Sequence, residues 1–167
     1  AELAEMHANG IRGIRVNLYR YGAMHNVELQ KIALTTHARA LDGNCTGWSM
    51  AFTHTHPEFW SALKLVIAQE VVPRGIRLVT DHFALLKGAS MLPAECEGDV
   101  THQQGFNDIL DLVRAGHIFV KISAPYRVST QAPGFDDLKP LVMALFDANP
   151  QQLLWGSDWY DLLDLFE

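Results

Sequence analysis

Polar side chains of the types used in hydrolytic enzymes follow two short apolar runs of this chain. Asp81 and His82 come directly after residues 76–80 (IRLVT), and Asp158 comes shortly after residues 153–156 (LLWG). A carboxylate at the end of a buried strand can act as a general base on water. A histidine there can polarise a carbonyl group or bind a metal. Each residue also fits a structural role, because Asp often caps a helix and His often closes a loop, so neither motif alone decides the function.

A third motif, residues 121–127 (KISAPYR), ends in an arginine that follows a proline-containing loop. The planar guanidinium group can bind both oxygens of a carboxylate, so Arg127 is a candidate for holding a substrate carboxylate. The alternative is a surface arginine that pairs with an acid such as Asp136 or Asp137.

The first apolar run of the chain, residues 11–18 (IRGIRVNL), carries two further arginines. Side chains alternate between the faces of a strand, so Arg15 and Asn17 share a face and Arg12 points to the other. If the face of Arg15 lines a barrel interior, this cation is buried and requires an anion. That anion is either a protein carboxylate or a ligand, and the residues leave both open.

A His-x-His pattern at His54 and His56 has the spacing of two metal ligands on one face of a strand. Pro57 follows directly, and a predicted helix begins there, so strand alternation is not expected to hold. The pattern therefore favours a solvated loop over a metal site.

Short β-branched runs alternate along the chain with segments typical of helices. Predicted strands cover residues 11–18, 47–53, 76–80, 118–123 and 153–156, and predicted helices cover residues 27–41, 57–70, 105–115 and 135–149. Asn26 is the expected N-cap of the first helix, Gly116 is expected to close the third, and Pro140 is expected to delay the start of the fourth. This alternation predicts a parallel α/β sheet, in which polar residues at the strand ends gather at one edge. The longest irregular segment, residues 87–104, is predicted to be a loop or a lid beside that edge.

Composition excludes several classes of function. The 167 residues are 49% hydrophobic and 19% charged, as in an ordinary globular domain, and the net charge of −6 argues against a nucleic-acid partner. No apolar run reaches the length of about 18 residues that a membrane span needs, so no membrane partner is expected. Cys45 and Cys96 lack metal-site spacing and are expected to be free thiols, which favours a cytoplasmic location.

Taken in order, the motifs resemble the amidohydrolase-related family, whose members are (β/α) barrels. The stretches that carry the resemblance are GIRGIRVNL (10–18), GWSMAFT (47–53), LVTDHFA (78–84), FVKISAPYR (119–127) and LLWGSDW (153–159). The last two are most similar to the subgroup that contains 2-pyrone-4,6-dicarboxylate lactonase and sugar-acid lactonases. The resemblance implies a single α/β domain over residues 1–167. It also implies an incomplete TIM barrel, because no stretch resembles the first two barrel strands.

The resemblance also implies roles for individual residues. Asp158 would be the base that activates water, and His82 would polarise a lactone carbonyl or contact a metal. The residues expected to bind a small carboxylated substrate are Arg127, Arg15, Arg12, Tyr126 and Ser123. The cofactor is either none or a divalent metal such as zinc, for which His82 and Asp158 would be the ligands.

Two departures from the family pattern keep other functions open. The His-x-His pair of the family's first strand is missing, and Trp159-Tyr160-Asp161 stands where the family usually has Trp-Pro-His. A catalytically inactive remnant and a metal-dependent decarboxylase are therefore alternatives to a lactone hydrolase. An incomplete barrel also leaves two open strand edges, which a second copy of the chain would cover in a homo-oligomer.

Overall fold

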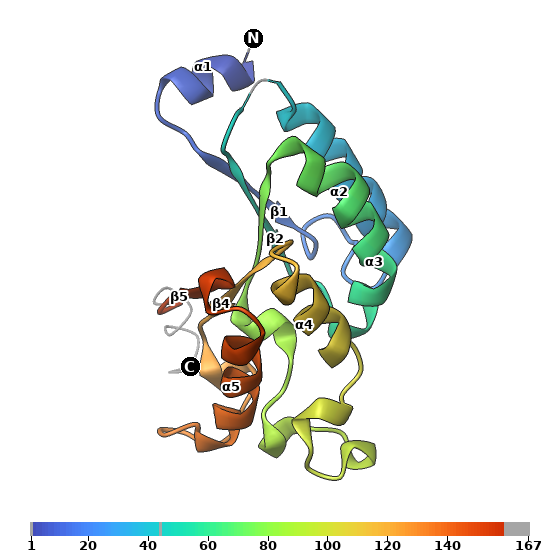
Figure 1. Ribbon diagram of the computed structural model, residues 1–167, viewed down its shortest axis with the longest axis vertical. Coiled ribbons are helices and arrows are strands. Elements are labelled where there is room, and N and C mark those ends of the chain that lie inside the picture. Colours follow the sequence, from blue (N-terminus) through green and yellow to red (C-terminus); the bar gives the residue numbers. More distant parts are fainter. Residues whose placement is uncertain (1, 44, 159–167) are drawn as a thin grey trace.

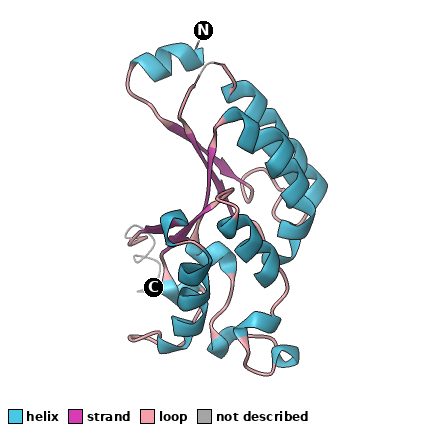
Figure 2. Cartoon of the chain, viewed as in Figure 1, coloured by secondary structure: helices cyan, strands magenta, loops and turns pink. Residues whose placement is uncertain are grey.

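The computed structural model describes residues 2–43 and 45–158. Helices and strands alternate along this part of the chain, as predicted (Figures 1 and 2). Their bounds are α1 (Glu2–Ala8), β1 (Gly13–Asn17), α2 (Val27–Leu41), β2 (Ser49–Thr53), α3 (Trp60–Val66), β3 (Arg77–Thr80), α4 (Phe106–Arg114), β4 (Phe119–Ile122), α5 (Lys139–Ala148) and β5 (Leu153–Trp155). The five strands form one parallel sheet in the order β1-β2-β3-β4-β5. Each predicted strand is therefore confirmed, with ends that differ by a few residues.

One face of the sheet packs against the helices and forms the core. Val16, Met50, Leu78 and Val120 point to this face and are buried, because α2, α3, α4 and α5 pack side by side over it (Figure 1). The opposite face would be the interior of a closed barrel. It carries the alternate residues of the strands, so the side chains of one strand divide cleanly between core and barrel interior.

The barrel is incomplete, as predicted. A complete TIM barrel closes with about eight strands, whereas the described residues supply five, with β1 and β5 at the two edges. Apolar side chains near the β5 edge are consequently exposed, with 38% of Leu154 and 83% of Trp155 accessible to solvent. The unpaired backbone groups of such edges can pair with another strand.

The helix termini follow local signals in the sequence. The side chain of Asn26 accepts a hydrogen bond from the Leu29 amide at 3.1 Å and caps α2. Gly116 follows α4 in a left-handed conformation, with φ at 72°. Pro140 lies in the first turn of α5, which begins at Lys139 instead of residue 135. All three predictions are confirmed.

The helix predicted over residues 57–70 has a more varied form. A 3-10 turn at Pro57–Phe59 leads into α3, and the chain then continues as a π-helical segment at Ile67–Val71. A 3-10 turn at Val72–Arg74 ends it. Pro73 lies in this turn and has no amide hydrogen with which to continue α-helical bonding, which accounts for the change of helix type.

The irregular segment 87–104 contains short 3-10 turns and is attached to its surroundings by side chains. Gln103, which is buried, accepts a hydrogen bond from the amide of Lys87 at 2.7 Å and donates to its carbonyl at 3.0 Å. Cys45 and Cys96 are free, as predicted, and both are buried. Across the described residues, no helix has the length and apolar character that a membrane crossing requires.

Candidate active site

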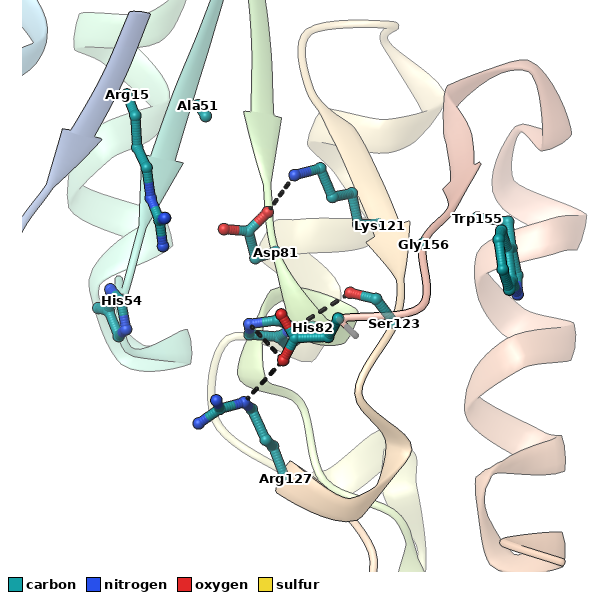
Figure 3. Close-up of a pocket in the computed structure, with 11 residues that line it drawn as sticks. Arg15, Ala51, His54, Asp81, His82, Lys121, Ser123, Arg127, Trp155 and Gly156 are labelled. Carbon is teal, nitrogen blue, oxygen red and sulfur yellow. Dashed lines mark hydrogen bonds and ion pairs between the residues drawn. The ribbon is translucent and has the colours of Figure 1, made fainter. Parts of the chain in front are cut away.

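A pocket of about 280 Å³ lies at the carboxyl ends of the strands, on the barrel-interior side of the sheet. It is lined by Arg15, Ala51, His54, Asp81, His82, Lys121, Ser123, Arg127, Trp155, Gly156 and Asp158. Figure 3 shows Arg15 and His54 on one side of this pocket, Lys121 and Ser123 on the other, and Asp81 and His82 between them. Segments from all five strands therefore meet here, as expected for the active-site end of a parallel α/β fold.

Asp158 is the centre of the hydrogen bonding in this pocket. Its Oδ2 accepts a hydrogen bond from the Tyr126 hydroxyl at 2.9 Å and one from Arg127 Nε at 3.2 Å, and it lies 3.8 Å from His82 Nε2. Burial alone would raise the pKa of the Asp158 carboxyl. The Tyr126 hydrogen bond, the electrostatic interaction with His82 in its protonated form, and the hydrogen bond and charge of Arg127 outweigh burial, and the pKa lies below its ordinary value. Asp158 is therefore a carboxylate at neutral pH.

His82 is held between Asp158 and Ser123. Its Nδ1 lies 3.0 Å from Ser123 Oγ, while its Nε2 faces Asp158. Burial is the largest influence on the ring and lowers the pKa of His82, although the neighbouring carboxylates Asp158 and Asp81 oppose this shift. The imidazole is therefore mainly neutral at neutral pH.

The chain reaches this geometry through a left-handed turn after β3. His82, Phe83, Ala84 and Leu85 have φ values of 53°, 57°, 54° and 62°. Each such residue costs about 1–2 kcal/mol relative to a right-handed conformation. Phe83 and Ala84 are 3% and 0% exposed, so their burial offsets part of this cost. Strain of this kind is common at functional sites, where packing maintains an otherwise unfavourable backbone.

Asp81, a largely buried carboxylate, forms an ion pair with the more exposed Lys121, a residue for which the sequence predicted no role. Lys121 Nζ lies 2.7 Å from Asp81 Oδ1, and only 10% of the Asp81 side chain is exposed. Lys121 lies in β4 and precedes Ser123, the residue directly after that strand, by two positions. Strand alternation thus placed both on one face and was a usable signal for Lys121.

The segment after β2 also departs from expectation. His54 lines the pocket, whereas His56 stacks on His25 with the ring centroids 4.9 Å apart. Thr55, between them, is 1% exposed, so the prediction of a solvated loop is wrong. The cause is the positive φ of His54, 71°, which ends the strand alternation.

The two arginines of the first strand lie at opposite ends of the sheet. Arg15 lines the pocket, but it is exposed instead of buried, because the open barrel leaves its face accessible. Arg12 precedes β1, donates to the carbonyls of His7 and Ile11, and lines a separate hollow at the amino ends of the strands. The structure therefore does not bring Arg12 to the predicted site.

Arg127 is not a surface arginine paired with Asp136 or Asp137, the alternative that the sequence left open. It pairs with Asp158, while Asp137 accepts hydrogen bonds from Ser90 and Ser129. Asp137 thereby attaches the segment 87–104 to the loop after β4. Arg127 is thus part of the pocket.

The residues present do not fit a metal centre. No group of three or more histidine, cysteine, aspartate or glutamate side chains gathers around a common point within residues 2–43 and 45–158. His82 and Asp158 come close to each other, but they supply only two candidate ligands. No step through a metal follows from this site. The C-terminal departure at Trp159-Tyr160-Asp161 lies outside the described residues.

Comparison with known proteins agrees with this fold. A 4-sulfomuconolactone hydrolase of Rhizobium radiobacter is 27% identical over 161 residues, which cover 95% of this chain and 47% of that enzyme. An enzyme of the same name from Hydrogenophaga intermedia is 37% identical over 57 residues, or 34% of this chain and 19% of that enzyme. The chain thus spans about half the length of the Rhizobium enzyme, and its match to the Hydrogenophaga enzyme covers a smaller share of that protein.

Solved structures share the fold at low sequence identity. An amidohydrolase of Burkholderia multivorans, solved with bound zinc, matches with a TM-score of 0.66 and 18% identity over 97% of this chain and 56% of its own. A probable 2-pyrone-4,6-dicarboxylic acid hydrolase of Acinetobacter baumannii, solved with citric acid, matches with a TM-score of 0.61 and 20% identity over 96% of this chain and 54% of its own. The family model described as amidohydrolase matches residues 1–163, and the chain therefore belongs to the amidohydrolase family.

Proposed function

We propose that this chain hydrolyses the ester bond of a small carboxylated lactone. The observation that carries the proposal is the convergence of Asp158, His82 and Arg127 on one pocket, which places a general base, an imidazole and a carboxylate-binding group within reach of one small molecule. The names of the Rhizobium and Hydrogenophaga relatives, both sulfomuconolactone hydrolases, support the same class of substrate.

In the proposed reaction, Asp158 takes a proton from water. Its Oδ2 is occupied by Tyr126 and Arg127, and among the described residues no hydrogen bond reaches Oδ1, so Oδ1 is the oxygen that accepts the proton. The hydroxide attacks the lactone carbonyl carbon, and His82 donates a hydrogen bond to the oxyanion. The ring C–O bond then breaks, and the leaving oxygen takes the proton from Asp158 to give a hydroxy acid.

The substrate's carboxylate would bind at the arginines of the pocket. Arg127 would share its guanidinium between that carboxylate and Asp158, and Arg15 would approach from the opposite side. Tyr126 contributes through Asp158, because its hydroxyl donates to the base. Small-molecule sites of this type usually combine a few convergent polar groups with a preformed cavity.

A ring-opening assay tests this proposal directly. The lactone substrates would be 2-pyrone-4,6-dicarboxylate and 4-sulfomuconolactone, and the rate would be followed by the loss of lactone absorbance. We expect Asp158→Asn to lower kcat by about a hundredfold or more. Asp147→Asn is the matched control, because Asp147 is exposed on α5, away from the pocket. Absence of turnover by the unmodified chain, or equal rates for it and Asp158→Asn, would refute the proposal.

Location and association belong to the same proposal. Free, buried cysteines agree with a reducing compartment, and we place the protein in the cytoplasm on that ground. Among the described residues β1 and β5 form the two edges of the sheet, which supports association of two or more copies of the chain, since strand edges readily pair.

A further inference from the structure

The hydroxyl of Ser123 is buried beside the imidazole of His82. Ser123 is 4% exposed, and its Oγ lies 3.0 Å from His82 Nδ1. Within residues 2–43 and 45–158, this ring nitrogen is the one group in hydrogen-bond contact with the Ser123 side chain. A buried hydroxyl carries one hydrogen that needs an acceptor, and Nδ1 is the acceptor within reach.

The other ring nitrogen faces a group that can only accept. His82 Nε2 lies 3.8 Å from Oδ2 of Asp158, which is an anion at neutral pH. A neutral imidazole has one N–H and one lone pair. A hydrogen on Nε2 with a lone pair at Nδ1 suits both neighbours. The reverse arrangement would turn a lone pair towards the carboxylate.

We infer that Ser123 is a positioning residue, which donates its hydrogen to Nδ1 and thereby holds His82 as the tautomer with hydrogen on Nε2. The hydrogen bond made by one ring nitrogen sets the protonation of the other. The Nε2 hydrogen then lies on the side of the ring that faces Asp158 and the pocket, where it could also reach a substrate carbonyl oxygen. This assignment differs from a direct contact between Ser123 and the substrate.

The inference deepens the proposed hydrolysis, since a donor at Nε2 is what an oxyanion requires, and it rests on the proposed function for its catalytic meaning. The tautomer itself is a property of the unliganded protein. Only a neutral imidazole has two tautomers. Burial lowers the pKa of His82 and leaves the ring uncharged at neutral pH, although the nearby Asp158 and Asp81 oppose that shift.

The test is the NMR measurement of the His82 tautomer in the full chain. Protein labelled with ¹⁵N at histidine is measured at about pH 8, where the ring is neutral. Long-range correlations from the ring carbon-bound hydrogens give the Nδ1 and Nε2 shifts, and His82→Gln identifies the signals of His82. We expect a protonated-type shift at Nε2 and an unprotonated-type shift at Nδ1. The opposite pattern would overturn the inference without any variant.

Three variants separate Ser123 from its neighbours. In Ser123→Ala, only the more distant Asp158 still favours one tautomer, so both ring shifts should move towards the averages of a mixture. Ser123→Thr keeps the hydroxyl and should keep the original pattern. Ser49 lies on the same sheet face at the amino end of β2, so Ser49→Ala is a control that should also keep the original pattern of ring shifts. Ring shifts in Ser123→Ala identical to those of the unmodified chain would show that Ser123 does not set the tautomer.

Asp158→Ala provides the complementary measurement. With the carboxylate gone, Ser123 remains as donor to Nδ1, and we expect the Nε2–H pattern to persist. Loss of the pattern in this variant would assign the tautomer to Asp158 and overturn the inference. All these measurements are made without substrate, so a negative lactone assay would refute the proposed function and leave the tautomer assignment standing. If turnover is found, Ser123→Ala should lower kcat more than it changes KM, and Ser123→Thr should restore it.

Discussion

The hydroxyl of Tyr126 donates to Oδ2 of Asp158 across 2.9 Å, in a contact that joins the loop after β4 to the residues after β5. A hydrogen bond to the charged form of a carboxyl stabilises that form. Tyr126 therefore helps to keep Asp158 ionised, in opposition to its burial. In the proposed hydrolysis, Oδ1 is the oxygen that would accept a proton from water.

Tyr126→Phe should raise the pKa of Asp158 towards its ordinary value, because the donor is lost while burial remains. A hydrogen bond to a charged group contributes about 1.5–3 kcal/mol, so kcat/KM should fall by about tenfold or more. Carbon-detected NMR titration of the Asp158 carboxyl measures the first effect. Tyr21→Phe is the control, since Tyr21 is exposed and far along the chain from Asp158. An unchanged Asp158 titration would contradict this prediction.

Arg15 and Arg12 provide a matched pair at opposite ends of the sheet. Burial is the main cause that lowers the pKa of His54, and the charge of Arg15 lowers it further. Arg15→Met should therefore raise the pKa of His54, whereas Arg12→Met should leave it unchanged. If Arg15 also binds a substrate carboxylate, its substitution should raise KM by about tenfold, as loss of a charge-assisted contact of about 1.5 kcal/mol implies. Equal changes in the pKa of His54 and in KM for the two substitutions would contradict the assignment of Arg15, and not Arg12, to the pocket.

Stability should fall as the pH is lowered past the ordinary pKa of histidine. His82 in the folded chain has a pKa below the ordinary value of 6.5, mainly through burial, so between the two values the unfolded chain binds more protons than the folded one. The free energy of unfolding therefore rises with pH in this window, and the contribution is fully present above 6.5.

Urea unfolding between about pH 5 and pH 8 measures this slope. His82→Gln should flatten it, although His54 retains part, because burial also lowers the pKa of His54. His117→Gln is the control, since His117 lies in the turn before β4, away from the pocket. A His82→Gln slope as steep as that of the unmodified chain would rule out this role for His82.

The position of Gly105, where the segment 87–104 meets α4, requires a residue without a side chain. Its φ is 80°, and a Cβ at this position would collide with the carbonyl oxygen of Pro57. Gly75 also has positive φ, 65°, but a Cβ there would meet no atom within 4 Å. Gly75→Ala should therefore cost about 1–2 kcal/mol from backbone strain alone. Gly105→Ala should cost at least about 1–3 kcal/mol more, which denaturant unfolding of the two variants would compare. Equal costs would contradict the collision.

Among the described residues β5 is an edge strand, so we expect the chain to associate. Trp155 is 83% exposed beside this edge, and a lysine there should weaken pairing with another strand. Sedimentation velocity over a range of concentrations should show self-association that Trp155→Lys reduces. Leu65→Lys is the control, because Leu65 is 64% exposed but lies on α3, away from the edge. A chain that stays monomeric at every concentration would refute the prediction.

Local signals account for the parts of the fold that were predicted correctly. Residues 27–41 form α2 with the predicted bounds, because Asn26 caps the first turn and polar and apolar positions recur with helical spacing. The strands were recognisable as short β-branched runs, and their alternation with helices implied a parallel sheet. Arg127, His82 and Asp158 were candidates because each follows a strand, and parallel strands bring such residues to one edge.

Other features depend on contacts between segments that are distant in the sequence. The pairing of Lys121 with Asp81 requires the register of β3 and β4, and the turn at His54 follows a positive φ that no residue type announces. Arg12 and Arg15 are three residues apart, yet β1 begins between them, and their side chains line two separate hollows of the sheet.

The sequence by itself determined the order and type of the elements and the identity of the chemical groups, since these depend on neighbouring residues. The tertiary structure decided which groups meet. Tyr126 and Arg127 converge on Asp158, Ser123 meets His82, and Arg12 is left out, because the parallel sheet and the left-handed turn after β3 set the distances between segments.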